Sequence, residues 1–596
     1  MDRKPDWSFE TPSVDRKKIL KRMRRAEKVS TRHAHKFLVK RLDTIRTARR
    51  HILQWLVLVS VLIAATGLQL TWAQSNYQTI GTAKGGTYAE AMVGQIDTLN
   101  PLYATTEPEL AASRLLFSSL YTFDTSGKLS KSLAESTTID ESGKIYTVKI
   151  RPDAFWHDGK PLTAKDVAFT INLIKKPAVM SPLRINWQDV NVRAIDDLTV
   201  EFTLPALYAA FTHALTFAVL PSHLLEEIPA GAIRENTFSR YPVGSGPFTF
   251  RLLQTVGGQN GYKIIQMAAF DKYYKGEPTV SRFEIHAHAT KEKAVASLRS
   301  GSVNAVSGVP ASAVGSLSDA GYSVGRHRVN SGVYALFNVS RPILQDKTVR
   351  QALQLGTDTK TIRNQLLVST PRLDLPFVNG QLTGDDVPTA PAPDKEKAAA
   401  LLDAAGWKLV DGIREKEGEK LTLAVTTTKD EQYEKVMEGL ASQWRTLGVV
   451  VATNIVDPSL PGANFVQSVL QPRNYDVLIY ELLIGADPDV YAYWHSSQIG
   501  STGYNFSNYS NPTADAALVS ARSVLASDLR NIKYKTFSKV WLEDVPAIGL
   551  YQPVVVYVTN KHIQSVGESM PFVSAADHYA NVLDWSVRER TVYKTP

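Results

Sequence analysis

The chain has 596 residues, 44% of them apolar, which is enough for several domains and a large buried core. Residues 1–51 hold 17 of the 67 Lys and Arg but only 6 of the 58 Asp and Glu, a net of +11, so the remainder carries −2. A nearly neutral main body lacks the basic face that nucleic acid needs, so we expect no nucleic-acid partner. The absence of Cys excludes disulfides, thiolate metal sites and a lipid-anchored cysteine.

Residues 1–51 form a basic tail with scattered apolar residues. These recur at partly helical spacing, at Ile19, Met23, Phe37, Leu38, Leu42 and Ile45. One interpretation is an amphipathic helix lying on anionic lipid. RNA binding is a weaker one, because no aromatic cluster accompanies the charge. A topology signal with no further role is the third.

Residues 52–73 form an apolar run without a charged side chain, ILQWLVLVSVLIAATGLQLTWA. About 20 such residues suffice for a helix to cross the roughly 30 Å of a bilayer core. Arg46, Arg49 and Arg50 stand before this run, and the next charged residue after it is Lys84. This asymmetry predicts a transmembrane helix with the tail in the cytoplasm and the main body outside the cell.

Two alternatives to a membrane anchor are weaker. A buried helix of a soluble core would not need this length or this charge asymmetry. A signal peptide is suggested by the small residues around Thr71-Trp72-Ala73, but a charged leader of fifty residues is too long for one. We therefore predict an uncleaved anchor, followed by a polar linker at residues 74–86.

The main body alternates helix and strand signals. Thr106 and Glu109 form a capping-box pattern that predicts a helix to about Leu120, preceded by an ordered loop. Farther on, alternation of apolar and polar residues over 146–150 predicts a half-buried strand. Thr163 and Asp166 then predict a second capped helix that ends at Lys175-Lys176-Pro177.

At this point the sequence resembles the family 5 solute-binding proteins of ABC transporters, the peptide-, nickel- and oligosaccharide-binding receptors. The clearest block reads LAES…YTVKIR…FWHDGKPLTAKDVAFTI. Further blocks follow in the family's order: Leu99–Tyr103, Ala194–Leu204, Pro242–Phe248, Phe337–Asp358, Asp394–Trp407 and Val540–Gln552, with YDVLIY…DPDVYAYW and NYSNPTADAAL before the last. The resemblance covers the chain from about Gly85 to the C-terminus.

The resemblance implies a two-lobed α/β fold of the periplasmic-binding-protein type (type II, large cluster with an extra subdomain), behind the one transmembrane helix. Residues alone would indicate only a mixed α/β chain of several domains. The implied boundaries are lobe I at 87–120, 201–333 and 511–596, an extra subdomain at 121–200, and lobe II at 334–510.

Catalytic patterns are scarce in this sequence. There is no G-x-S-x-G elbow, no HExxH and no phosphate-binding loop. Gly244-Ser245-Gly246 is followed by Pro and is interpreted as a tight turn. His286 and His288 share one side of a strand, but two His are a poor metal site, and we interpret them as a satisfied pair on a strand surface. The sequence therefore indicates a binding protein without enzymatic activity, metal or cofactor.

The resemblance implies that a peptide is gripped through its main chain, because strand edges can pair its N–H and C=O groups whatever its side chains are. The implied contacts in lobe I are Thr105, Thr106 and Glu107. Those in lobe II are Glu481, Leu482 and Leu483. A Trp often occupies this lobe II strand in the family, and its absence here leaves the shape of the first pockets open.

A peptide's α-ammonium needs an anionic partner. The resemblance implies an Asp shortly after the lobe II strand, with Asp487 first and Asp489 second. The alternative is that Asp487-Pro488 is the N-cap and first residue of the helix VYAYW. The two interpretations are equally supported and do not exclude each other.

We expect a monomeric membrane-anchored receptor whose lobes close on a peptide and present it to ABC permease subunits. Two alternatives stay open. The same fold could bind a nickel chelate, haem or an oligosaccharide, although the lack of Cys and of a His cluster disfavours bare nickel. The chain could instead be a surface sensor that acts through its basic tail, which is longer than an anchor requires.

Overall fold

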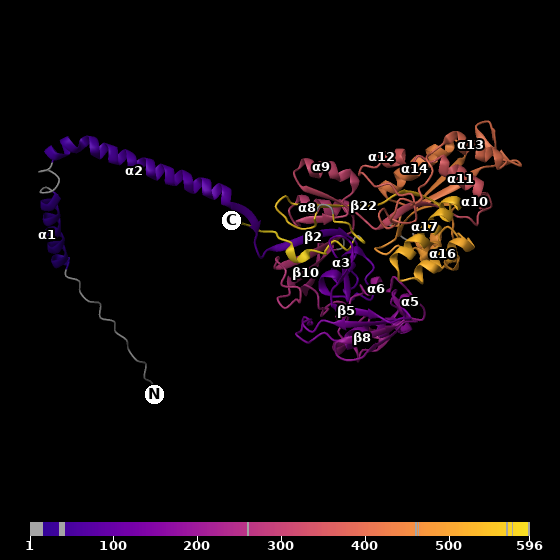
Figure 1. The fold of residues 1–596 in the computed structure, drawn as a ribbon, viewed down its shortest axis with the longest axis horizontal. Helices are drawn as coiled ribbons and strands as arrows, with labels where there is room; N and C mark the ends of the chain where they lie inside the picture. The colour runs from indigo at the N-terminus through magenta and orange to yellow at the C-terminus, as the bar shows by residue number, and fades with distance from the viewer. Residues whose placement is uncertain are drawn as a thin grey trace. The chain divides into compact units, whose positions relative to one another are not determined.

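The computed structural model describes residues 16–34, 42–258, 261–458, 460, 462, 464–567, 570–574 and 576–593. The chain forms two units, residues 1–81 with 590–596, and residues 82–589. The first unit holds the tail and the apolar helix, and the second holds both lobes (Figure 1). Each unit is described by itself below.

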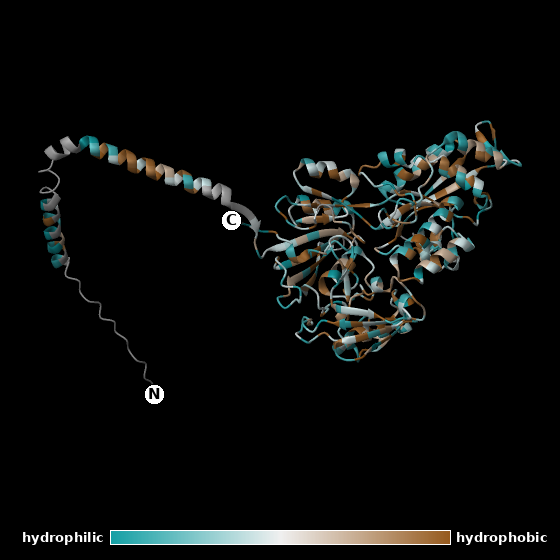
Figure 2. Ribbon diagram, viewed as in Figure 1, coloured by the Kyte–Doolittle hydropathy of each residue, from teal (hydrophilic) through white to brown (hydrophobic). Residues whose placement is uncertain are grey.

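The first unit contains helices α1 (Arg16–Ala34) and α2 (Leu42–Tyr77). Within α2, residues 49–72 are long and apolar enough to cross a membrane, and Figure 2 shows the hydrophobic colour gathered along this helix. The side chains of these residues are exposed. The helix continues to Tyr77, and strand β1 (Gln78–Thr82) then pairs with β23 (Glu589–Tyr593). The predicted linker at 74–86 is thus largely regular structure. The tail residues Phe37 and Leu38 lie outside the described residues.

Lobe I is built on a seven-stranded mixed sheet in the order β13-β22-β12-β2-β11-β10-β9. Its strands are β2 (Thr87–Val93), β9 (Phe248–Val256), β10 (Tyr262–Ala269), β11 (Arg282–His288), β12 (Ala305–Ser307), β13 (Ser323–Arg328) and β22 (Val554–Thr559). Its helices are α3 (Glu107–Leu116), α8 (Lys291–Arg299) and α9 (Val314–Asp319). The middle strand β2 has five consecutive buried residues, as expected for a strand covered on both faces.

The extra subdomain consists of a hairpin and a four-stranded sheet in the order β5-β6-β8-β7. Its strands are β3 (Tyr121–Phe123), β4 (Leu129–Lys131), β5 (Ala134–Ile139), β6 (Ile145–Ile150), β7 (Asn191–Ala194) and β8 (Thr199–Thr203). Its helices and those that follow are α4 (Ala164–Lys175), α5 (Arg184–Trp187), α6 (Phe211–Ala214) and α7 (Ser222–Leu225). The predicted strand and the helix capped by Thr163 and Asp166 are confirmed. The subdomain shares one hydrophobic core with lobe I.

Lobe II is built on a five-stranded sheet in the order β19-β18-β20-β14-β21, with a small three-stranded sheet beside it. Its strands are β14 (Ser331–Phe337), β15 (Lys408–Val410), β16 (Ile413–Lys416), β17 (Glu419–Lys420), β18 (Thr422–Thr428), β19 (Val450–Val456), β20 (Val477–Leu483) and β21 (Ala547–Tyr551). Its helices are α10 (Pro342–Gln345), α11 (Lys347–Leu355), α12 (Thr359–Asn364), α13 (Lys395–Ala404), α14 (Glu431–Arg445), α15 (Tyr491–Trp494), α16 (Pro512–Arg522) and α17 (Ser527–Asp544).

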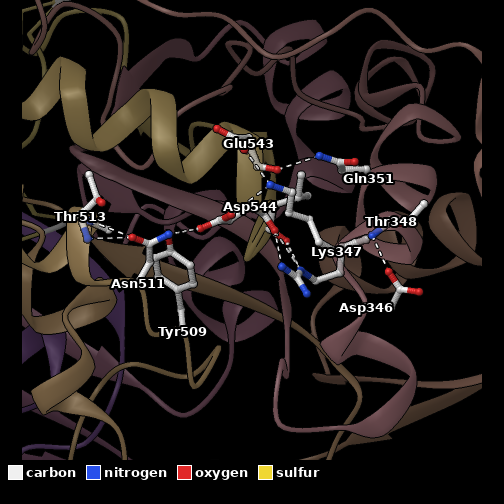
Figure 3. Close-up of polar contacts among 12 residues, drawn as sticks. Asp346, Lys347, Thr348, Gln351, Tyr509, Asn511, Thr513, Glu543 and Asp544 are labelled. Carbon is white, nitrogen blue, oxygen red and sulfur yellow. Dashed lines mark hydrogen bonds and ion pairs between the residues drawn. The ribbon is translucent and has the colours of Figure 1, made fainter. Parts of the chain in front are cut away.

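The predicted end of lobe II at residue 510 is corrected by this topology. Strand β21 pairs with β14 inside the lobe II sheet, and α16 and α17 pack on the lobe II core. Figure 3 shows how α17 is tied to lobe II: Asp544 accepts hydrogen bonds from Tyr509 and Asn511, and Lys347 pairs with Glu543. Residues 511–551 therefore belong to lobe II, because a strand joins the sheet that completes its hydrogen bonds, which local sequence does not reveal.

Two crossover segments join the lobes, at residues 329–330 and 552–553. They lie side by side, because the N–H of Val329 donates to the carbonyl of Pro553 at 3.0 Å. The side chain of Gln552 also donates to the carbonyl of Val329, at 2.9 Å. The two connections are thus coupled to each other by a backbone hydrogen bond and by a hydrogen bond from the Gln552 side chain.

Candidate functional site

The predicted lobe I contacts lie at the end of a loop, residues 97–106, that is ordered by one carboxylate. Glu109 accepts hydrogen bonds from the N–H groups of Asp97, Thr98, Thr105 and Thr106, at 2.8, 3.1, 2.9 and 3.1 Å. Burial raises the pKa of Glu109, but these four donors outweigh it and hold the pKa below its ordinary value. We call residues 97–109 the lobe I loop.

The predicted capping box of Thr106 and Glu109 is confirmed, and helix α3 begins at Glu107 and ends at Leu116, four residues earlier than predicted. The same contacts occupy the N–H groups of Thr105 and Thr106, so neither can donate to a guest. The carbonyl of Thr106 accepts from Leu110. The Glu107 side chain accepts from Ser307 at 3.1 Å. Of the backbone groups of Thr105 and Thr106, the Thr105 carbonyl is the one that has no hydrogen-bond partner among the described residues.

The predicted lobe II contacts lie at the end of β20, which is paired on one side only. On one side β14 covers the whole strand, from Val477 to Leu483. On the other side β18 pairs only at Val477 and Leu478, and Thr427 donates to the Ile479 carbonyl at 3.1 Å. Past Ile479, this side of β20 has no strand partner among the described residues. We call residues 479–483 the lobe II edge.

The alternation of a strand decides which groups the lobe II edge offers. Because Ile479 faces β18, the N–H and C=O of Glu481 and Leu483 face the same, unpaired side. The Leu483 carbonyl accepts from the Tyr493 hydroxyl at 2.7 Å. The edge therefore presents both backbone groups of Glu481 and the N–H of Leu483. Leu482 points into the lobe II core, and the Leu483 side chain is exposed.

The two aspartates expected to receive an α-ammonium are already paired with arginines. Asp487 forms two hydrogen bonds with Arg530, at 2.8 and 2.6 Å. Asp489 accepts from Arg522 at 2.9 Å. The four side chains are mostly buried. Both carboxylates therefore have a cation of their own, and the structure gives them the geometry of internal ion pairs.

The alternative interpretation of Asp487 as a helix cap is wrong. Helix α15 begins at Tyr491 and its N-cap position is Val490. The side chain that reaches the first turn is Asp489, which accepts from the Tyr491 N–H at 3.3 Å. Pro488 lies before the helix rather than in its first turn.

Residues beside these ion pairs connect lobe II to the segment that follows the extra subdomain. The N–H of Ala209 donates to the Arg522 carbonyl at 2.8 Å, and the Arg522 guanidinium lies 4.8 Å from the Tyr208 ring centroid. His213 Nδ1 lies 3.9 Å from Asp487. At a second place, Lys291 of lobe I pairs with Asp430 of lobe II at 3.2 Å. The two lobes thus contact each other through charged and aromatic side chains.

The segment Gly244-Ser245-Gly246 packs against the end of α3; it is irregular backbone that bends at Gly246, rather than the predicted tight turn. A Cβ on Gly244 would lie 1.8 Å from the Leu116 carbonyl oxygen. His157 accepts from the Gly244 N–H and contacts the Gly246 carbonyl through its other ring nitrogen, at 3.2 and 3.1 Å. Burial lowers the pKa of His157 to about 4, so the imidazole is neutral at pH 7.

His286 and His288 are both buried, rather than exposed on a strand surface as expected. His286 pairs with Glu284 at 3.0 Å, and Tyr262 stacks on both rings. His286 Nδ1 and His288 Nε2 have no hydrogen-bond partner. In the part of the chain that the structure describes, no group of three or more His, Asp or Glu is arranged to hold a metal ion.

A cavity of about 100 Å³ lies in lobe I, between α3 and the loop at 576–583. None of the predicted site residues lines it. Its volume is well below the roughly 300 Å³ at which ligand sites begin. It is therefore not the site of a peptide or a chelate.

Several residues around the site escape sequence reasoning. Arg522 and Arg530 lie more than thirty residues along the chain from the aspartates they bind. Ser331 and Tyr433, which both donate hydrogen bonds to Glu481, are even farther from it in the sequence. Nothing local in the sequence marks these partners. The one available signal is the resemblance, which groups the β20 segment and the α16–α17 segment without pairing their residues.

The model of the bacterial extracellular solute-binding proteins, family 5, matches residues 128–504. The oligopeptide-binding protein AppA of Bacillus subtilis is 29% identical over 524 residues, 85% of this chain and 94% of that protein. Its structure with a nonapeptide has a TM-score of 0.69 at 26% identity, covering 85% of this chain and all of that one. NikZ of Campylobacter jejuni, solved with Ni(L-His), has a TM-score of 0.72 at 27% identity, covering 84% and 99%.

The match by the family model covers more than half of the chain, and the structural neighbours share its two-lobed α/β architecture. Proteins of this family are transport receptors rather than enzymes. The expected fold is therefore confirmed, and the chain belongs to the bacterial extracellular solute-binding proteins of family 5.

Proposed function

We propose that this chain is the membrane-anchored receptor of an ABC importer and that it captures peptides between its lobes. The observation that carries this proposal is the lobe II edge, which offers unpaired backbone groups beyond Ile479. An extended peptide presents the complementary N–H and C=O groups at every residue, so it can add to such an edge as a strand. The likeness to peptide-binding relatives over 85% of the chain supports the same ligand class.

The proposed grip is unequal between the lobes. Glu481 and Leu483 supply the backbone donors and acceptors, while Leu482 anchors the edge in the core. The Thr105 carbonyl, with the side chains of Thr106 and Glu107, contacts the guest from lobe I. Asp487 and Asp489, with their arginines, hold the end of the edge in place rather than receive the guest's ammonium.

Closure around the coupled crossovers would complete the mechanism. A guest that touches both lobes favours the closed form, because only that form satisfies both sets of contacts. Lys291 and Asp430 would add to this preference, since their pairing joins the lobes. The closed receptor would then deliver the peptide to the permease.

The test of ligand class uses the full chain in lipid nanodiscs. We expect a random hexapeptide mixture to raise the melting temperature and to yield bound peptides in native mass spectrometry. The second candidate, favoured by the likeness to NikZ, is a nickel chelate, tested with Ni(L-His) in parallel. A shift with Ni(L-His) and none with any peptide would replace the peptide proposal.

We further propose that α2 is an uncleaved anchor at residues 52–73, with the tail in the cytoplasm and both lobes outside the cell. Because the chain has no Cys, a single introduced thiol reports topology without background. A membrane-impermeant maleimide should label Ser136→Cys in intact cells, and label Lys21→Cys only after lysis. Labelling of Lys21→Cys in intact cells would reverse the proposed orientation.

The tail's proposed partner is anionic lipid. The described helix α1 carries basic side chains throughout, and Leu20, Met23 and Val29 are exposed. A dye on Met23→Cys should shift its emission to the blue in nanodiscs that contain phosphatidylglycerol, and not in neutral ones; a shift with RNA alone would favour the nucleic-acid alternative. The receptor itself is proposed to be a monomer, testable by its mass in light scattering.

A further inference from the structure

Glu481 differs from Asp487 and Asp489 in how its negative charge is compensated. Its carboxylate accepts hydrogen bonds from the Ser331 hydroxyl at 2.6 Å and from the Tyr433 hydroxyl at 3.1 Å. No Lys, Arg or His within the described ranges forms an ion pair with it. Asp487 and Asp489, a few residues along the chain, are each bound by an arginine.

Lys291 pairs with Asp430, whose charge acts on the same tyrosines as that of Glu481, and forms no ion pair with Glu481. Asp430 precedes α14, on which Tyr433 lies, and it pairs with Lys291 of lobe I at 3.2 Å. The pair is thus complete without Glu481. A partly buried carboxylate that meets only hydroxyl donors is less well compensated than one bound by a cation, so its position favours a cation from outside the chain.

Aromatic side chains lie on the same face of the sheet as Glu481. Tyr433 contacts it directly, and Tyr551 lies in the same row across the sheet, because Glu481 pairs with Val333 and Val333 with Tyr551. Burial raises the pKa of both tyrosines, and the charge of Glu481 raises it further. Tyr551 is buried in the lobe II core, whereas Tyr433 is only partly buried. The Tyr433 ring beside the carboxylate suits the apolar stem and the charged head of Lys or Arg.

The guest's path supplies the remaining geometry. The N–H and C=O of Glu481 belong to the unpaired lobe II edge, so a peptide added to that edge passes directly beside this residue. A guest side chain or terminus at this point can reach the Glu481 carboxylate without displacing an ion pair of the protein.

We propose that Glu481 receives a cationic group of the guest, so that the receptor selects peptides with an ammonium or guanidinium at one position. This inference rests on the proposed function. It also assigns a role to a residue of Glu481-Leu482-Leu483, the segment of the strand that lacks the Trp frequent in the family. The cation can be a Lys or Arg side chain or the peptide's own α-ammonium.

The test measures dissociation constants of defined hexapeptides for the full chain in nanodiscs by calorimetry. The peptides are alanine-based, with Lys or the neutral norleucine at each position in turn, and with a free or an acetylated N-terminus. We expect one position, or the free N-terminus, to bind about tenfold tighter than its neutral counterpart. The position identifies which source supplies the cation.

Variants assign the preference to Glu481. Glu481→Gln keeps the size of the side chain and should reduce the preference to near unity, and Glu481→Lys should invert it toward Glu-containing peptides. Glu543→Gln is the matched control, because Glu543 is an exposed carboxylate paired with Lys347 on α11 and should keep the wild-type preference. Melting temperatures confirm that each variant is folded.

The outcomes separate the two proposals. Peptides that bind without any preference for a cation, or with a preference that survives in Glu481→Gln, overturn the role of Glu481 and leave the proposed function standing. Failure of every peptide to bind overturns both. A tenfold preference lost in Glu481→Gln and kept in Glu543→Gln establishes the role.

Discussion

The lobe I loop and the lobe II edge differ in how their backbone groups are hydrogen-bonded, although the resemblance implies that both contact the peptide main chain. In the loop, one buried carboxylate, Glu109, accepts four N–H groups and leaves little for a guest. In the edge, the pairing of β20 with β18 ends after two residue pairs and leaves backbone groups open. Backbone groups that are paired within the protein make the loop rigid, whereas the unpaired backbone groups of the edge are available to bind a peptide. The comparison predicts that substitutions in the loop lower the stability of the fold, and that substitutions in the edge lower the affinity for peptides.

The largest expected effect concerns the support of the lobe I loop. Gly244→Ala should cost more than about 4 kcal/mol, because the new Cβ would overlap the Leu116 carbonyl at the end of α3. Loss of soluble protein or of the cooperative thermal transition would show it. Gly231→Ala is the control, because a Cβ there meets nothing within 4 Å. Equal stability of the two variants would contradict the close packing of Gly244 on the end of α3.

The next effect concerns the end of the lobe II edge. Arg530→Met should cost about 3–5 kcal/mol, because it leaves the buried Asp487 carboxylate without its cation. Adding Asp487→Asn should recover much of that loss, which urea unfolding of the single and double variants can measure. If Asp487 instead serves as the guest's ammonium site, Arg530→Met would tighten binding of free peptides over acetylated ones, and the role given to Glu481 would weaken.

A smaller effect tests the loop itself. Glu109→Gln should cost about 2–3 kcal/mol, because an amide cannot accept all four N–H groups. Hydrogen exchange should rise at residues 97–106 and stay unchanged in β20. The affinities of all peptides should fall by one common factor, in contrast to Glu481→Gln, which changes one class only. If Glu109→Gln changed the affinity of one class of peptide only, the proposed difference between the loop and the edge would be wrong.

The smallest expected effect is a pH dependence of folding stability that arises from His157, which contacts Gly244 and Gly246 in lobe I. The pKa of His157 is lowered from its ordinary 6.5 to about 4, so the unfolded chain binds a proton that the folded one does not. Stability should therefore fall as pH drops from about 6.5 toward 4, by about 2 kcal/mol at pH 5 from this residue. His157→Gln should flatten that slope in melting curves. Burial also lowers the pKa of His288 to about 4, so His288 contributes to the same pH dependence of stability, and the His157→Gln variant retains that contribution.

What the sequence predicts well is local. The capping boxes at Thr106 and Thr163 and the alternating strand predicted at 146–150 follow from neighbouring residues, and the structure confirms them. The resemblance adds the two-lobed fold, because many ordered blocks together specify a topology that no single block could.

What the sequence does not predict is pairing over distance. That residues 511–551 complete the lobe II sheet depends on β14 having a free side for β21. Asp487 forms an internal ion pair because Arg530, 43 residues away in the sequence, lies beside it in the fold. The Thr105 N–H cannot donate to a guest because the folded chain places the Glu109 carboxylate next to it. These are consequences of packing, and a one-dimensional pattern does not contain them.

The pairing of β1 with β23 joins the first strand after the apolar helix to the last strand of the chain. During synthesis β1 emerges hundreds of residues before β23, its strand partner among the described residues, so a chain that lacks β23 carries a bare strand edge, a surface prone to wrong pairing. A chain stopped at residue 588 should therefore be cut by proteases near residues 78–82, while a chain that includes residues 589–593 resists cleavage there.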